Sequence, residues 1–518
     1  MRRAAGGAEL TSQEARSDDL TRWWRWYALV MIFSVTRAPR VAALFGLCAL
    51  ASCGARSSLL GDDPSLAGPG GTTDTTGTAS AGGGGGEGGS GLPPCHLVSA
   101  SPPSIPLHSF PEGNADTSML AVIDPGDATD PSGPRPARVA SQAISEDANF
   151  WHPELRVAGL TVGADWPDGL VVDPPPTLVG FDAHSWGRTA VGAGGEVAVL
   201  WFHGDEAAGL PTGLQIRTFE VESWANGPAV FVDPGGSVAH ALRPGKLDGT
   251  PDGPDGFVAA WSSYAAVSAV EPHVAVMDGA GKIAMGPFAV PGADFYPRTY
   301  ADVLWTGTTH LVAVGAMECP DFGPPCVSSA MNILRIVPPS DDSAGGVELV
   351  SSIPLVKADG EARRPSFART AKAVWLTWSE SEPEDQTAPR QQRLARLDFS
   401  GNVVGAPELL VEGLDTVTAM TSSATDTDLL IAWGELAKPD SNPASPGYAR
   451  IVLHHRDAEG VPLDPPLSID TTAFSNNPSI SMVGLQHPHA MLVTWSSVAV
   501  DGAKSITYLS RLDCSDVN

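Results

Sequence analysis

The chain has 518 residues, of which 56 are Gly and 46 are Pro, and so many helix-disfavouring residues exclude an all-helical protein. Hydrophobic residues make up 42% of the sequence, enough to form a large core, which excludes a chain that is disordered throughout. The formal net charge of −28 argues against a nucleic-acid-binding surface, because phosphate binding requires a basic footprint.

An apolar, uncharged stretch covers residues 41–51 and follows Arg37 and Arg40. Its basic flank is typical of a secretory signal, and it is too short to cross a bilayer. It runs into Leu50-Ala-Ser-Cys53, which resembles the lipobox of bacterial lipoproteins. The resemblance implies lipidation at Cys53, export, and a lipid anchor in the outer membrane, with the protein facing the periplasm or the cell surface. A core helix that happens to contain Cys53 is the alternative.

The start of the signal is expected at Met31, because a signal peptide takes roughly 15–30 residues in all. Residues 31–52 are then the lipoprotein signal peptide, and residues 1–30 an extension that comes from a gene start assigned too far upstream. An amphipathic aromatic membrane segment around Trp23, Trp24 and Trp26 is the alternative.

Residues 53–94 are rich in Gly, Ser and Thr and have hardly any large apolar side chains. This composition cannot form a core, so it predicts a disordered tether, with a mean reach of about 35 Å for a Gly-rich coil. The folded domain is expected over residues 95–518.

A repeated pattern runs through this domain: an apolar strand that ends in Trp, with Gly in place of Trp in one copy. The copies end at Trp201, Trp261, Gly315, Trp378, Trp433 and Trp495, at spacings of 54 to 63 residues. Such spacing suits a four-stranded propeller blade with long loops. We expect the Trp rings to be buried between blades.

The second half of each repeat contains Asp-x-x-Gly, as at Asp278–Gly281, Asp398–Gly401 and Asp457–Gly460. These are the residues that a type I turn prefers at its first and fourth positions, so each predicts a hairpin. One less regular unit precedes the others. We therefore predict an all-β propeller of seven four-stranded blades; six blades, with residues 102–175 as an irregular cap, is the alternative.

The last repeat stops at Cys514 without a fourth strand, and the segment that begins at Cys95 is an apolar strand that can supply it. An even number of cysteines in an oxidising compartment predicts disulfides. With Cys53 lipidated, we expect one bond between Cys319 and Cys326 and one between Cys95 and Cys514, which closes the ring. Free buried thiols are the alternative.

The lipobox and the Trp repeats together resemble uncharacterised secreted bacterial lipoproteins with Trp-containing β-propeller-type repeats. The resemblance covers about 420 residues. It implies a fold and a location and brings no known activity.

Motifs for nucleotide hydrolysis, zinc proteases and serine esterases are absent from the sequence. Asp248, Asp252 and Asp255 lie close together on a Gly- and Pro-rich segment. Carboxylates at short spacing suit Ca²⁺, and no other cofactor is expected. A tight connection between strands contains the same residues and is the alternative.

Polar residues stand two positions after each Trp, and in a closed ring they should form a circle at one end. They are His203, Ser263, Glu380, Glu435 and Ser497. His203 with Asp205, and Glu380 with Glu435, are the acid–base candidates, because paired carboxylates can divide acid and base roles. A rim of solvated loop residues is the alternative.

The sequence thus predicts a monomeric cell-envelope lipoprotein whose propeller binds a protein or a glycan, with the membrane contacted through the lipid alone and no nucleic acid bound. The absence of a nucleophile motif favours binding over catalysis. A secreted glycan-active hydrolase that uses the rim carboxylates is the alternative, and a structural array within an envelope complex is a third hypothesis.

Lipidation gives the first testable prediction. Cys53→Ala removes the thiol that accepts the lipid, so the variant should leave the membrane fraction or accumulate as the unprocessed precursor. Fractionation followed by immunoblotting measures both, and Cys48→Ala is the matched control. A Cys53→Ala variant that stays on membranes at the wild-type size contradicts the lipoprotein interpretation.

Overall fold

Every regular element in the described part of the computed structural model is a β-strand. No described helix is therefore long and apolar enough to cross a membrane. The predicted signal peptide, the predicted tether and all six cysteines lie outside the described residues. The structure describes residues 96–97, 105–108, 114–124, 126, 135–146, 154–163, 168, 170–180, 187–203, 212–225, 227–266, 269–291, 300–318, 327–356, 360–381, 390–414, 417–437, 448–463, 465–471, 480–485, 490–498 and 505–513.

The strands form seven antiparallel sheets, each a blade of four strands in chain order, except that the last takes its outer strand from the N-terminal side. Blade 1 consists of β3 (Asn114–Asp124), β4 (Ala137–Glu146), β5 (Glu154–Val162) and β6 (Leu170–Gly180). Blade 2 consists of β7 (Arg188–Val191), β8 (Val197–His203), β9 (Gly213–Phe219) and β10 (Val230–Asp233). Blade 3 consists of β11 (Gly236–Lys246), β12 (Asp255–Ala266), β13 (Ala269–Asp278) and β14 (Ile283–Ala289).

Blade 4 consists of β15 (Ala301–Trp305), β16 (His310–Glu318), β17 (Val327–Val337) and β18 (Gly346–Pro354). Blade 5 consists of β19 (Glu361–Arg369), β20 (Val374–Ser381), β21 (Arg390–Leu397) and β22 (Glu408–Leu414). Blade 6 consists of β23 (Val417–Ala424), β24 (Asp428–Ala437), β25 (Tyr448–Asp457) and β26 (Leu467–Thr471). Blade 7 contains β27 (Ile480–Leu485), β28 (Ala490–Val498) and β29 (Ser505–Asp513), with β1 (His96–Leu97) and β2 (Ile105–His108) along its outer edge.

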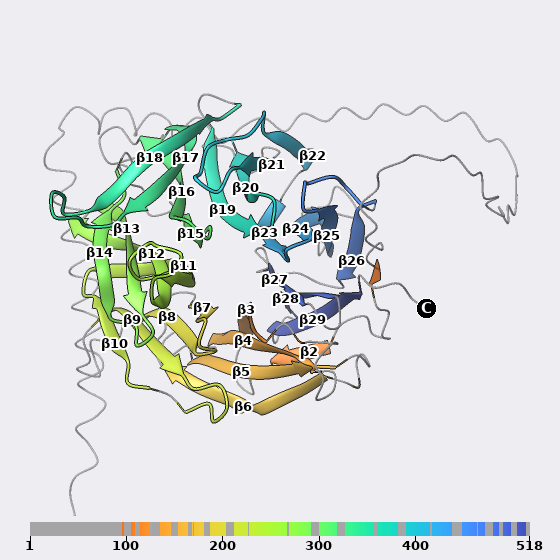
Figure 1. Cartoon of the computed structure of the whole chain (residues 1–518). Coiled ribbons are helices and arrows are strands. Elements are labelled where there is room, and N and C mark those ends of the chain that lie inside the picture. Colours follow the sequence, from red (N-terminus) through yellow and green to blue (C-terminus); the bar gives the residue numbers. More distant parts are fainter. Residues whose placement is uncertain are drawn as a thin grey trace, which may run out of the picture. The chain divides into compact units, whose positions relative to one another are not determined.

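The first strand of each blade contacts the first strand of the next, from β3 through β7, β11, β15, β19 and β23 to β27, which contacts β3 again. The ring is therefore closed, with these seven inner strands around its axis (Figure 1). The seven-bladed propeller predicted from the repeats is confirmed, and the six-bladed alternative is wrong because residues 114–180 form a full blade.

The core is divided among the interfaces between blades, one apolar cluster to each. In five blades, a Trp on the second strand packs on the preceding blade: Trp378 of β20, for example, shares a cluster with Leu311 and Ile333 of blade 4. All five predicted Trp rings are buried, at 2% exposure or less. Their predicted location between blades is confirmed.

Gly315 stands where the other repeats have Trp, and its surroundings explain the exception. A Cβ atom at this position would lie 2.6 Å from the backbone oxygen of Ala362 in β19. Real Cβ atoms do not approach an oxygen so closely, so the inner strand of blade 5 leaves room for Gly alone. The exception thus follows from the packing of two neighbouring blades.

The Asp-x-x-Gly turns also connect blades. In each, the Gly N–H donates to the Asp carbonyl oxygen, as from Gly460 to Asp457 at 2.9 Å, and the Gly has a positive φ. The Gly Cα lies against the preceding blade, because a Cβ on Gly460 would lie 2.2 Å from the Trp375 ring. The predicted hairpins are confirmed, and their glycines are required by both φ and packing.

The ring closes as predicted, with a strand from the N-terminal side on the edge of β29. His96 pairs with Asp513 and Leu97 with Leu512 in β1, and β2 continues along the same edge, where Ile105 pairs with Leu509. Two short strands thus supply what the sequence predicts as one. They cover an edge that would otherwise offer unpaired backbone groups to another chain.

The two disulfides remain predictions, and the neighbouring ladders support both. Cys95 and Cys514 are next in sequence to the paired residues His96 and Asp513. Cys319 and Cys326 are next to Glu318 and Val327, which pair at the end of the β16–β17 ladder.

Peptide mapping under non-reducing conditions should yield both bonds. Cys514→Ser should then lower the free energy of unfolding by about 4–5 kcal/mol, because the bond closes a very long loop. Free thiols at Cys95 and Cys514 in protein folded under oxidising conditions would contradict the closure bond.

His310 gives a pH-dependent prediction. Its Nε2 accepts a hydrogen bond from the Lys246 backbone N–H at 3.1 Å, and its ring contacts Trp305. Burial lowers the pKa of His310 to about 4. As the pH decreases, His310 therefore binds a proton near pH 6.5 in the unfolded chain but only near pH 4 in the folded chain. The free energy of unfolding should then fall as the pH decreases from about 6.5 towards 4.

The loss attributable to His310 should reach about 2 kcal/mol between pH 7 and pH 5. His310→Gln keeps an acceptor for the Lys246 N–H and does not titrate, so its stability should change less over this range. Urea unfolding of both proteins at several pH values measures the difference. Parallel profiles for the two proteins would show that the imidazole is not the titrating group.

Candidate functional site

The two ends of the ring differ in their connections. Because neighbouring strands are antiparallel, the Asp-x-x-Gly turns and the connections from first to second strands lie at one end, which we call the turn end. The connections from second to third strands lie at the opposite end, together with those that lead from one blade to the next. We call this the long-connection end, after its connections over residues 204–212, 382–389 and 438–447.

The predicted circle of polar residues belongs to the long-connection end, because each residue follows its Trp near the end of a second strand. The alternative, a rim of solvated loop residues, is wrong for His203, Ser263, Glu380 and Glu435. All four are within strands and only 5–8% exposed. Ser497 is in β28, and its side chain is outside the description, as is Asp205 altogether.

The Glu380 carboxylate contacts three groups, two from its own blade and one from the preceding blade. The indole N–H of Trp378 donates to its Oε1 at 3.0 Å, and the Val356 backbone N–H donates to Oε2 at 3.2 Å. Arg393 Nε lies 3.7 Å from Oε1. The carboxylate thus accepts the polar hydrogen of a buried Trp.

Glu435 repeats this arrangement in blade 6. The indole N–H of Trp433 donates to its Oε1 at 3.1 Å, and Arg450 Nε donates to Oε2 at 2.6 Å. Residues i and i+2 of a strand share a face, so Trp-x-Glu is sufficient to bring indole and carboxylate together. Both carboxylates have a structural role, and their proposed division of acid and base roles stays a hypothesis.

Of the aspartates proposed for Ca²⁺, Asp248 and Asp252 are in the connection between β11 and β12, and Asp255 begins β12. Both the backbone N–H and the hydroxyl of Thr250 donate to Asp248 Oδ1 at 2.9 Å, which lowers the pKa of Asp248. Asp255 Oδ1 lies 2.7 Å from Lys246 Nζ. Within the described ranges, no three His, Cys, Asp or Glu side chains are close enough to share a metal ion.

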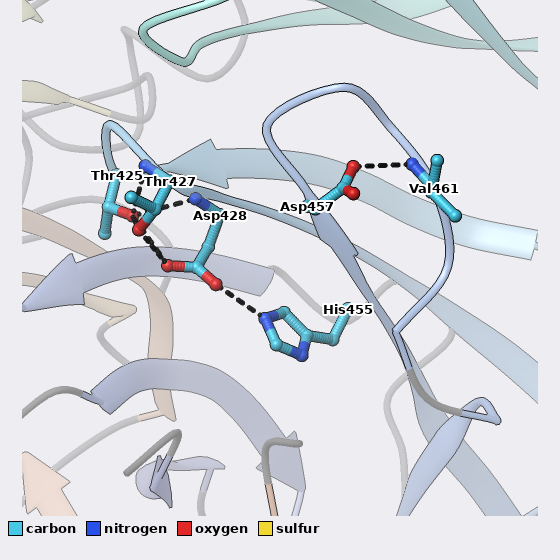
Figure 2. Close-up of polar contacts among 6 residues, drawn as sticks. All are labelled: Thr425, Thr427, Asp428, His455, Asp457 and Val461. Atoms are coloured by element: carbon cyan, nitrogen blue, oxygen red, sulfur yellow. Dashed lines mark hydrogen bonds and ion pairs between the residues drawn. The ribbon is translucent and has the colours of Figure 1, made fainter. Parts of the chain in front are cut away.

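A second polar cluster, at the turn end of blade 6, resembles a catalytic arrangement at first sight. Figure 2 shows His455 Nε2 beside Asp428 Oδ1, at 2.9 Å, with the hydroxyls of Thr425 and Thr427 on the opposite oxygen of Asp428. The hydroxyls donate to the carboxylate, so neither is activated by the imidazole. Asp428 and His455 are buried, at 0% and 2% exposure. The cluster therefore joins the β23–β24 turn to β25.

The sequence analysis did not single out the arginines of the inner strands. Arg188 is on β7, Arg243 on β11, and Arg363 and Arg364 on β19; we call these four residues the inner arginine cluster. Arg243 donates through Nε and Nη2 to Asp302 of β15, at 3.2 and 2.6 Å, and Arg363 pairs with Glu361. Arg188 donates to the carbonyl oxygens of His240 and Gly187, at 2.5 and 3.4 Å.

Two further side chains connect this cluster. Tyr300, just before β15, lies edge-on to His240, with ring centroids 6.0 Å apart, and the Arg364 guanidinium lies 5.8 Å from the Tyr300 ring centroid. His240 Nε2 lies 2.6 Å from the Ser262 hydroxyl. Burial lowers the pKa of His240 to about 3, so its ring is neutral at pH 7 and adds no charge to the cluster.

Asp302 holds three blades together beside this cluster. It pairs with Arg243 of blade 3, and it accepts the Phe367 backbone N–H of blade 5 at 2.7 Å. Because Asp302 belongs to blade 4, one buried carboxylate fixes three consecutive inner strands. The arginines therefore stand on a rigid support.

No family model and no curated protein matches the chain. Among solved structures, it is similar to the α-L-arabinofuranosidase of Fusarium graminearum, at 11% identity and a TM-score of 0.41 over 64% of this chain and 93% of that one. It is also similar to the α-L-arabinanase of Penicillium chrysogenum (11%, TM-score 0.42, 64% and 94%) and to the fucose-specific lectin of Aleuria aurantia (10%, TM-score 0.38, 71% and 99%). Similarity at this level does not identify a ligand or a reaction.

The structural role of Glu380 can be tested by two substitutions. Glu380→Leu leaves the buried Trp378 indole and Arg393 without this acceptor and should lower the free energy of unfolding by about 1–3 kcal/mol. Glu380→Gln keeps an oxygen for the indole and should cost less. Urea unfolding measures both, with the half-exposed Glu348→Leu as control. A Glu380→Leu variant as stable as the wild type would leave the residue free for a catalytic role.

Proposed function

We propose that this protein is an exported, lipid-anchored β-propeller that binds a protein or a glycan of the cell envelope through the long-connection end of the ring. The lipobox at Cys53 and the tether of residues 53–94 support the anchoring. A tether of this length holds the ring clear of a membrane surface and leaves its ends accessible.

The observation that carries the proposal is the convergence of charged and polar side chains from several blades near the long-connection end, among them His203, Glu380 and Glu435. At the turn end, the glycines of the Asp-x-x-Gly turns pack on neighbouring blades, as Gly460 does on Trp375. Loops carried by a rigid scaffold are the usual place of binding surfaces.

Glycan hydrolysis is the second candidate, favoured by the equivalent positions of Glu380 and Glu435 on neighbouring blades. A glycosidase needs two carboxyl groups, one of them available as a proton donor. Both glutamates already accept an indole N–H and face an arginine of their own blade. Binding without cleavage does not require either carboxylate to act as a proton donor, so we prefer binding to hydrolysis as the proposed function.

The experiment is co-sedimentation of the purified protein with envelope polysaccharide and with envelope proteins, together with an assay for new reducing ends. We expect retention without cleavage. Replacing residues 438–447 by a Gly-Ser segment of equal length should weaken retention, whereas Glu459→Ala at the turn end should not. Reducing ends that accumulate with the wild type and disappear in Glu380→Gln and Glu435→Gln would establish the hydrolase instead.

A further inference from the structure

The outer edge of blade 7 is built differently from the outer edges of the other six blades. In blades 1 to 6, the outer strand of each described sheet follows the neighbouring third or first-paired strand directly in the chain. In blade 7, the outer edge consists of β1 and β2, which precede every other strand in the sequence and pair with β29 alone. These two strands can therefore separate from the ring without opening any other described ladder.

Few backbone pairs hold β1 and β2 in place. β1 pairs with β29 through His96 and Leu97. β2 pairs with β29 through Ile105, Pro106 and His108, and its register shifts between Pro106 and His108. The β28–β29 ladder of the same blade, by comparison, runs the full length of both strands. Short ladders at an edge are among the first parts of a fold to open locally, so β1 and β2 should detach more readily than the other strands of blade 7.

The connection that joins these strands to the ring is short. Residues 109–113 alone link the end of β2 to the start of β3 in blade 1. A short connection leaves the chain few ways to turn β2 back onto its own ring, whereas the same connection in an extended form carries β2 away from the ring. Exchange of an identical element between copies is a low-cost route to a dimer, and short connections favour it.

We propose that β1 and β2 of one copy pair with β29 of a second copy, and reciprocally, to form a strand-exchanged dimer. The edge of β29 then receives the same residues in the same register as in the closed monomer, so a second copy of this chain is the partner that the edge fits. The two forms share these contacts and differ by the entropy lost on association. Dilute protein should therefore be monomeric and concentrated protein dimeric. The inference goes beyond the proposed function and does not depend on the lipid anchor.

Complementary cysteine variants test the exchange. Cys514→Ser keeps Cys95 beside β1, and Cys95→Ser keeps Cys514 beside β29, so neither variant can form the predicted closure bond within one copy. The two full-length variants are mixed at high concentration and oxidised, and the peptides of the covalent dimers are mapped by mass spectrometry.

We expect a peptide pair linked through Cys95 and Cys514 in these dimers, because exchange places the first thiol of one copy next to the second thiol of the other. Each variant oxidised alone is the control and should not yield this pair. If the mixture does not yield it although the wild type forms the same bond, the inference is wrong.

Light scattering of the reduced wild type over a range of concentrations provides a measurement that needs no disulfide. The molar mass should rise from that of one chain towards that of two. Inserting Gly-Ser-Gly-Ser after Glu112 lets β2 return to its own ring more easily, so this variant should dimerise only at a concentration about tenfold higher or more. The same insertion after Pro251, in the β11–β12 connection, is the control and should dimerise like the wild type. A wild type that stays monomeric at every concentration, or a dimer unaffected by the insertion after Glu112, would reject strand exchange.

Discussion

The packing of each blade on the one before it is the constraint on which the whole structure depends. Each Trp at the end of a second strand enters the cluster of the preceding interface, so the angle between two blades depends on the side chains there. Because the ring must close, these angles have to sum to a full turn. The repeated strand, the repeated turn and the exception at Gly315 all follow from that requirement.

The same constraint explains why conspicuous carboxylates have a structural role. A buried indole needs an acceptor for its N–H, and the residue two positions along the strand is the nearest one on the same face. Glu380 and Glu435 provide it in blades 5 and 6, and Asp233 of the preceding blade provides it for Trp261 at 2.7 Å. Buried acidic residues at equivalent positions of successive blades are therefore no sign of catalysis by themselves.

The architecture could be predicted because each blade repeats the same features in the sequence. Apolar strands that end in Trp recur at near-constant spacing, and the missing last strand has a counterpart after the tether, so blade number and closure follow from counting. The inner arginine cluster has no such signature. Arg188, Arg243 and Arg364 are far apart in the sequence and follow no common motif, and the closed ring alone brings their strands together.

The place where the chain enters the ring has a mechanical consequence. Residue 96 begins the short strand β1 on the edge of blade 7, and β1 pairs with β29 through His96 and Leu97 alone. Tension in the segment before residue 96 therefore acts first on these two residue pairs. A covalent bond beside His96 and Asp513 would carry that tension in place of the two-residue pair.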